Sequence, residues 1–506
     1  MMKSILTQAT PFQKIYSSAP NVSIPTYFIA GILTLLFFGF TALFNMPLYV
    51  FIVVVSLPIF WMMVNYPRTW IYAVILGFVV FMKMDEEGIS FSDIFAAVLY
   101  NSFLIFWFIA RLLVKSDVSA NVAFSNNHFR ITSVVDKLFL TFYALLLFNV
   151  IIALTNGIEL FDWLREYMLY SLILFYFPLR EYFAERKYIY ILLLLFGLVV
   201  IALDIRQFYS YYEILGNVKY AYQIASSVRD NQQVFSCSLI SAITFFFYAN
   251  TRRAKLFALV VSLFSAAAII STFSRAFWTA LMAMVLVLFI FLNYKQILQF
   301  ILIIALATGI ILISINTLFP HQASFVTKYI GKRFTSTSNV KKDISVESRL
   351  REYEIVLGEI KDSPIWGHGF RKQFSFYNNI MHATHTTSFT HNGYFNLSHK
   401  AGIPMCALFY LAMGLTTIKG FFVGLRLNRH CRSNLDGCEK YKIYTAMAIS
   451  GTLSIIMLLI VNSVTSSFIF RDGLMVTAFA IAFIHIASKK YDEVKNLYSQ
   501  SRLLPE

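Results

Sequence analysis

Runs of about 20 mostly apolar residues recur along the chain, and they constrain its fold more than any other feature. Inside a bilayer every backbone N–H and C=O group must be hydrogen-bonded within the protein, so such runs form helices. Charged residues make up only 13% of the sequence, whereas soluble domains contain about 25%. The sequence therefore predicts an all-α, polytopic membrane protein.

The apolar runs predict twelve to fourteen transmembrane helices, among them 26–44, 163–180, 232–250 and 442–462. The range is open because the run at 46–64 contains prolines and the run at 70–83 is short for a span. We divide the chain into four parts by hydropathy. They are an N-terminal helix bundle (1–317), a large polar loop (318–400), C-terminal helices (401–490) and a tail (491–506).

Lysine and arginine are unevenly shared between the segments that join the predicted spans. If both termini are cytoplasmic, the cytoplasmic segments hold several times more of these residues than the short outer loops, as the positive-inside rule requires. Parity then places the loop 318–400 on the outer face. The net charge of +16 is attributed to loops beside anionic membrane lipid, and no nucleic-acid partner is expected.

The loop 318–400 holds six of the nine histidines and includes an amphipathic helix. The helix is predicted from apolar residues at three- and four-residue spacing, and it ends at Asp362. On this helix Arg349 falls at the edge of the predicted packed face, and Arg351 points to water. The predicted apolar stripe consists of Val346, Leu350, Tyr353, Leu357 and Ile360.

Two arginines are candidates for binding an anion. Arg275 lies between two apolar runs, where a charged group is costly unless it reaches the interface or a polar cavity. It either extends to the outer membrane surface or contacts an anion. Arg349 either pairs within its own helix or points into a cavity. A guanidinium group is always charged and can bind phosphate oxygens through two N–H groups.

Among the histidines, His391 opens the return from the loop into the membrane. An imidazole has an ordinary pKa near neutrality, so it can act as a general base there. His382 and His385 have the spacing of a metal-binding pair on a helix, but the surrounding sequence favours a helix poorly and supplies no carboxylate. We therefore predict no metal site and no cofactor.

A second outer segment, 205–231, carries Arg206, Arg229 and five tyrosines. We expect it to lie along the outer membrane surface. The tyrosines either stack on sugar rings or pack at the interface, and the two arginines are assigned to substrate contacts.

The order of these motifs resembles the bacterial O-antigen ligase and O-antigen polymerase superfamily, over about 270–410. Many members have tryptophan where this chain has Tyr353, and the chain is longer than typical ligases. The matching residues are Ser274-Arg275, Ser348-Arg349 with Tyr353, Pro364 to Gly369, His391-Asn392 and Gly402-Ile403-Pro404.

The resemblance implies a fold like that of the C-type glycosyltransferases (GT-C) in the bacterial inner membrane, with the active site facing the periplasm. It implies a donor glycan on undecaprenyl diphosphate, and an acceptor that is lipid A–core or another glycan. Arg275 and Arg349 are then expected to bind the donor diphosphate, His391 to act as base, and Asn392 and Tyr353 to contact substrate, without a metal. A diphosphate leaving group independently calls for fixed cations when no metal is present.

Four functions remain open from the sequence, and one of them is a membrane sensor or scaffold whose outer loop binds cell-wall glycan. A ligase passes the whole glycan to an acceptor lipid, and a polymerase passes it to another lipid-linked repeat unit. Another is a flippase for lipid-linked oligosaccharides, which also has twelve to fourteen helices. The long outer loop favours the ligase and the polymerase, because a flippase is expected to have short loops.

Overall fold

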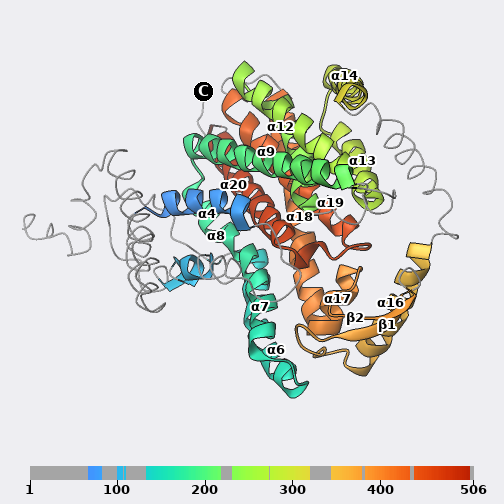
Figure 1. Cartoon of the computed structure of the whole chain (residues 1–506). Helices are drawn as coiled ribbons and strands as arrows, with labels where there is room; N and C mark the ends of the chain where they lie inside the picture. The colour runs from blue at the N-terminus through green and yellow to red at the C-terminus, as the bar shows by residue number, and fades with distance from the viewer. Residues whose placement is uncertain are drawn as a thin grey trace, which may run out of the picture. The chain divides into compact units, whose positions relative to one another are not determined.

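The computed structural model describes residues 66–81, 100–105, 107–109, 131, 133–217, 231–272, 274–318, 344–378, 382–432 and 438–501 (Figure 1). The predicted spans 26–44 and 46–64 lie outside the described residues, as does Arg229. The chain divides into two units, residues 1–74 with 102–130 and residues 75–101 with 131–506. Helix α4 (Pro67–Phe81) runs across their boundary, and everything below concerns the second unit.

Among the described residues, six helices are long and apolar enough to cross a membrane. This confirms the prediction of an all-α polytopic membrane protein. Three further apolar helices are α11 (Gln232–Tyr248), α13 (Arg275–Phe289) and α14 (Tyr294–Leu318). The six are α6 (Val134–Thr155), α9 (Arg186–Asn217), α12 (Arg252–Ser271), α18 (Ile403–Arg432), α19 (Lys442–Val461) and α20 (Arg471–Ser501).

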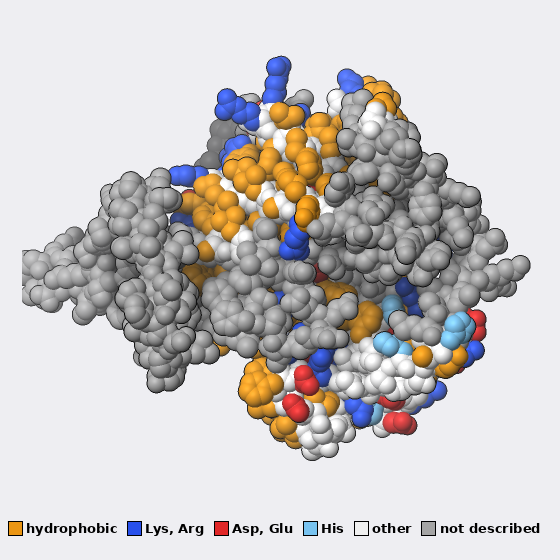
Figure 2. Space-filling model, in the orientation of Figure 1, with side chains coloured by type: hydrophobic (Ala, Val, Ile, Leu, Met, Phe, Trp, Pro, Cys, Tyr) orange, Lys and Arg blue, Asp and Glu red, His pale blue; other side chains and the backbone are white. Residues whose placement is uncertain are grey.

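Helices α19 and α20 form the centre of this bundle. The apolar windows of α19 and α20 are 83% and 89% buried, whereas those of α6, α9, α12 and α18 are 28–39% buried. The outer helices therefore turn most of their apolar surface outward, as lipid-facing helices do. Figure 2 shows this apolar surface over α9 and α12, while charged and polar side chains gather over the part that contains α16 and α17.

Two stretches differ from the sequence prediction. The predicted span 163–180 is broken into α7 (Leu160–Tyr170), a 3₁₀ turn η1 (Ser171–Phe175) and α8 (Tyr176–Tyr182). Helix α9 continues to Asn217, so the first half of the predicted surface segment 205–231 extends a transmembrane helix. At 1.5 Å per residue α9 is roughly 48 Å long, which exceeds the hydrocarbon thickness.

The described part of the large loop folds as α16 (Ile344–Asp362), a β-hairpin and α17 (Gly393–Ala401). The hairpin pairs β1 (Phe374–Asn378) with β2 (Ala383–Thr387) in antiparallel register. Only helices were predicted in this loop, so the hairpin differs from the prediction. A small core joins α16 to the hairpin and consists of Val356, Ile360, Phe374 and Phe376, with Ile355 and Phe395 packed against it.

The loop returns to the membrane through a glycine junction between α17 and α18. Gly402 has a φ of +86°, a backbone conformation that residues other than glycine rarely adopt. A Cβ at this position would lie 2.0 Å from the backbone oxygen of Ile365. Ile403 N–H donates to the Pro364 oxygen at 2.8 Å. The turn after α16 is therefore fastened directly onto the start of α18.

Candidate functional site

The buried face of α16 is not the apolar stripe predicted from the sequence. Leu350 and Leu357 are exposed, whereas Ser348, Glu352 and Val356 are buried. These three follow one another at four-residue spacing, so they share one face of the helix, and Ile360 continues it. The prediction failed because it used apolar periodicity alone, while this face carries a buried carboxylate.

Glu352 is buried because it binds His391 twice. Its Oε1 accepts a hydrogen bond from the His391 backbone N–H at 2.6 Å, and its Oε2 lies 2.7 Å from His391 Nδ1. The Glu352 side chain is 1% exposed and the His391 side chain is 38% exposed. Since a carboxylate accepts, Nδ1 carries the hydrogen and Nε2 presents its lone pair. This pair has the geometry of an oriented general base.

Contacts with the membrane helices fix the segment that carries His391. Asn392 caps α17, because its Oδ1 accepts from the backbone N–H groups of Tyr394 and Phe395. The Asn392 Oδ1 is thus committed to helix capping, and a substrate contact can use only its amide nitrogen. Gly393 N–H donates to the Asn462 oxygen at the end of α19.

Arg349 and Tyr353 lie about one turn apart on α16, and Glu352 lies between them in the sequence. Arg349 is half-buried and Arg351 is exposed, as the helix periodicity predicts. Arg351 pairs with Glu347 at 3.2 Å on the solvent side. Burial raises the pKa of Tyr353 to about 12, so its phenol stays protonated, and its ring packs edge-on against Phe395 of α17. Helix α16 therefore carries Arg349 and Tyr353 together with Glu352, the residue that contacts His391.

The other predicted arginines lie on different elements. Arg275 is the first residue of α13, preceded by Ser274 as N-cap. Arg206 lies in the outer part of α9 and is half-buried. The sharing of one site by Arg275, Arg349 and His391 stays a prediction, and Arg229 falls outside the described residues.

A buried ion pair holds the other end of α17. Lys400 Nζ lies 2.6 Å from Glu166 Oε1 of α7, and both side chains are almost fully buried. Glu166 Oε2 also accepts from the Arg371 backbone N–H at 2.9 Å. Asn149 of α6 donates to the Lys400 oxygen and accepts from Phe370 N–H. Both ends of α17 are thus bound to membrane helices, which positions the site at a seam between loop and bundle.

The six loop histidines separate into distinct environments. His385 lies on β2 with its ring edge-on to Phe376, and His382 lies in the hairpin turn with a φ of +51°. They therefore do not form a pair on one helical face. His368 and His399 converge on Glu359 of α16. His321 lies outside the described residues.

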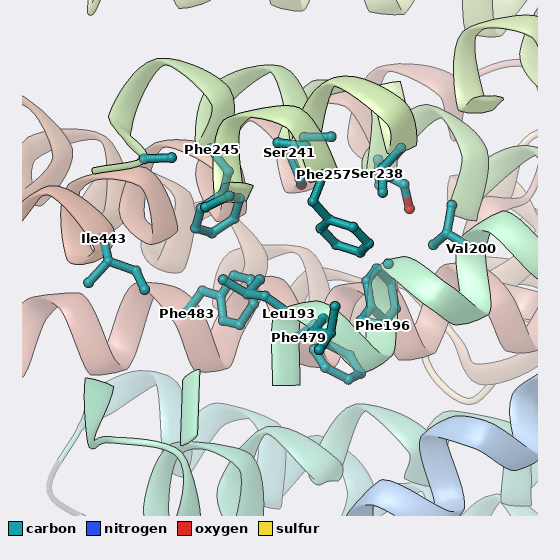
Figure 3. Close-up of a pocket in the computed structure, with 18 of the residues that line it drawn as sticks. Leu193, Phe196, Val200, Ser238, Ser241, Phe245, Phe257, Ile443, Phe479 and Phe483 are labelled. Atoms are coloured by element: carbon teal, nitrogen blue, oxygen red, sulfur yellow. The ribbon is translucent and has the colours of Figure 1, made fainter. Parts of the chain in front are cut away.

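A cavity of about 440 Å³ lies among α9, α11, α12, α19 and α20 (Figure 3). Phenylalanines from several of these helices line it, including Phe196, Phe257 and Phe479, and Arg253 is its one Lys or Arg. None of the predicted site residues lines this cavity. Its surface is suited to hydrocarbon and not to a diphosphate or a sugar.

Sequence reasoning missed Glu352, the residue that contacts His391. The sequence contained a signal for such a partner. A histidine that acts as a base needs a partner that fixes its tautomer. The predicted helix that precedes His391 contains a carboxylate, Glu352, four residues after Ser348. The choice among Glu352, Glu354 and Glu359 required the structure. Only Glu352 reaches His391 among the residues described.

A family model matches part of the chain. No curated protein sequence matches the chain. Residues 259–410 match the family model described as O-antigen ligase. The matched region contains Arg275, Arg349, Glu352 and His391, and it ends within α18. Residues 259–410 are therefore similar to an O-antigen ligase domain, which supports the resemblance of the chain to the O-antigen ligase and polymerase superfamily.

Proposed function

We propose that this protein is a glycosyltransferase that moves a glycan from a polyprenyl diphosphate carrier, undecaprenyl diphosphate, to a hydroxyl of an acceptor sugar. The observation that carries the proposal is the Glu352–His391 pair inside the O-antigen ligase domain. A histidine oriented by a buried carboxylate is the group that such a transfer needs at its acceptor.

In the proposed step, the acceptor oxygen attacks the anomeric carbon of the donor sugar, and the bond from that carbon to the diphosphate oxygen breaks. His391 Nε2 takes the proton of the attacking hydroxyl. Glu352 keeps the imidazole in the tautomer that can accept it, and stabilises the imidazolium that forms. The half-exposed His391 side chain leaves this nitrogen accessible to a substrate.

The leaving diphosphate gains negative charge as the bond breaks, and fixed cations lower the energy of that charge. Arg349 is the candidate nearest to the pair, because it lies less than one helical turn from Glu352. Arg275 is proposed as the second cation, from the start of α13. Tyr353 and the amide of Asn392 are proposed substrate contacts, and Arg206 and Arg229 are proposed to meet more distant parts of the donor.

The proposed setting is the bacterial inner membrane, with the site on the periplasmic face and both termini in the cytoplasm. The acceptor is proposed to be lipid A–core, which makes the protein a ligase. Joining one lipid-linked repeat unit to another, as a polymerase does, uses the same groups and is equally compatible with the family.

A glycan profile of a deletion strain tests the proposal. A ligase predicts that polymer disappears from lipid A–core and stays on the carrier. A polymerase predicts single repeat units. If all glycans form normally, or if lipid-linked units accumulate on the inner leaflet as for a flippase, the transferase proposal is wrong.

A purified assay separates the chemistry from the pathway. The full chain in detergent is given a polyprenyl-diphosphate glycan and lipid A–core, and product is followed over time. His391→Ala is expected to abolish transfer while the protein level stays unchanged. His385→Ala, on the hairpin, is the matched control and is expected to keep full activity. Full activity in His391→Ala would rule out the proposed base.

A further inference from the structure

Three ligand-bearing side chains meet at the far end of the α16–α17 contact. Glu359 lies about two turns after Glu352 on α16, and His399 lies near the end of α17, the helix that begins just after His391. His368 comes from the turn after α16. One ligand atom from each of Glu359, His368 and His399 lies within 4.8 Å of the other two.

The cluster is arranged around the Glu359 carboxylate and backbone. His399 Nε2 lies 2.5 Å from Glu359 Oε2, and His368 Nε2 lies 2.8 Å from the Glu359 backbone oxygen. A neutral imidazole that donates from Nε2 carries no hydrogen on Nδ1. His368 Nδ1 is therefore available as a metal ligand, while Nε2 donates to a backbone carbonyl. Metal-binding histidines usually donate their other ring N–H in this way.

The His399 side chain is fully buried, which fixes its ring beside the Glu359 carboxylate.

We propose that Glu359, His368 and His399 bind a divalent transition metal of the zinc class. Two imidazoles and one carboxylate suit Zn²⁺, whereas Ca²⁺ and Mg²⁺ favour oxygen ligands alone. The Glu359 side chain is 29% exposed, so the site has an approach from solvent and room for a water as fourth ligand.

Metal entry requires a small rearrangement. Ligand atoms about 2.0–2.1 Å from zinc in a tetrahedral site lie about 3.3 Å apart. The His399–Glu359 contact must therefore open by just under 1 Å, and the half-exposed Glu359 can move by this amount. The coordinating nitrogen of an imidazole must carry no hydrogen. On His399 the metal therefore replaces the hydrogen bond from Nε2 to Glu359, and the ring hydrogen moves to Nδ1. His368 coordinates through Nδ1 and keeps its hydrogen on Nε2.

The proposed metal has a structural role. Glu359 follows Glu352 by seven residues, which is about 10.5 Å along the helix, so the metal does not reach the reacting atoms. It would join α16, the following turn and α17 at one end of their contact, and the Glu352–His391 pair lies at the other. The inference does not depend on the proposed function, because its test measures metal and stability.

The test uses the full chain, purified in detergent and stripped with a chelator. Zinc is then titrated by calorimetry, bound metal is counted by mass spectrometry after dialysis, and thermal unfolding is followed with and without zinc. About one zinc per chain and a higher unfolding temperature with zinc are expected. Calcium and magnesium are expected to have no such effect.

Variants decide whether these three residues form the site. His368→Ala and Glu359→Gln are each expected to weaken zinc binding at least about tenfold and to remove the zinc-dependent shift in unfolding temperature. His385→Ala is the matched control and keeps both. His399→Ala removes a buried ring and so lowers stability even without zinc. The unfolding temperature of this variant is therefore compared with and without zinc, and not with that of the wild-type chain. Zinc binding that is absent in the wild-type chain, or unchanged in His368→Ala, would overturn the proposal.

Discussion

The carboxylate of Glu352 holds His391 at both its backbone and its ring. One oxygen accepts from the main-chain N–H at 2.6 Å and the other lies 2.7 Å from Nδ1. The first bond fixes where the chain passes α16, and the second fixes how the imidazole is turned. A buried charge is costly unless it is paired, so this arrangement is stable only while both contacts hold.

Glu352→Gln is expected to reduce the rate of glycan transfer by about 10²- to 10⁴-fold with the protein still folded. A neutral amide no longer stabilises the imidazolium, and its NH₂ group can turn the ring to the unproductive tautomer. The measurement is the transfer rate in the purified donor and acceptor assay, alongside the thermal unfolding temperature.

Glu354→Gln is the matched control, because Glu354 lies on the same helix and is exposed. Its rate is expected to equal that of the wild-type chain. A wild-type rate in Glu352→Gln would show that the carboxylate only supports the fold.

Arg349→Ala is expected to lower transfer by about 10²- to 10³-fold, the usual cost of removing one group that stabilises developing charge. Arg349→Lys is expected to recover only part of the rate, because an ammonium group cannot bind two phosphate oxygens in the planar manner of a guanidinium. The comparison is made at saturating donor, so that binding and turnover are separated.

Arg351→Ala tests whether any positive charge on α16 would serve. Arg351 is exposed and pairs with Glu347 at the surface, where such pairs are worth about 0–1 kcal/mol. Its rate is expected to stay within about twofold of wild type. Equal losses in both variants would mean that the loop needs net charge and has no specific diphosphate contact.

Arg275→Ala is expected to lower transfer to an extent similar to Arg349→Ala. Arg275 begins α13, which comes from the bundle and not from the loop. Combining the two substitutions tests whether both arginines act on one charge. Each loss of rate is converted to a free energy. If the double variant loses less than the sum of the two single losses, the two arginines bind one ligand. If the losses add fully, they act at two independent sites.

The bundle could be predicted from sequence because lipid imposes one rule on every span. The predicted span 442–462 is observed as Lys442–Val461 and 232–250 as Gln232–Tyr248. The hairpin could not be predicted in this way, since its strands are only five residues long and contact each other across a short turn. Their stability comes from Phe374 and Phe376 packing on α16, which is a tertiary effect.

The candidate site was partly predictable for a related reason. His391 and Arg349 were identified from residue type and order along the chain. Glu352 was missed because its buried position contradicts the apolar pattern of its helix. Lys400 and Glu166 were missed because 234 residues separate them and neither is unusual in its own segment.

Lys400→Met is expected to destabilise the protein by roughly 3–5 kcal/mol, because it leaves the buried Glu166 carboxylate without its partner. Adding Glu166→Gln is expected to restore part of the loss. Lys490→Ala is the control, since its pair with Glu493 is largely exposed and worth at most about 1 kcal/mol. Unfolding in denaturant, followed by tryptophan fluorescence, measures all of them, and equal effects of Lys400→Met and Lys490→Ala would contradict the account.

Gly402→Ala is expected to destabilise the junction between loop and membrane by at least about 1–3 kcal/mol, because its φ of +86° is strained for alanine and the new Cβ meets the Ile365 oxygen. Gly414→Ala, on α18 with nothing within 4 Å of its Cβ, is expected to be neutral or to stabilise by about 0.5–1 kcal/mol. Because Gly402 ends the helix that begins beside His391, Gly402→Ala is also expected to reduce transfer in proportion to the unfolded fraction. Normal stability together with lost transfer would instead place Gly402 at the substrate.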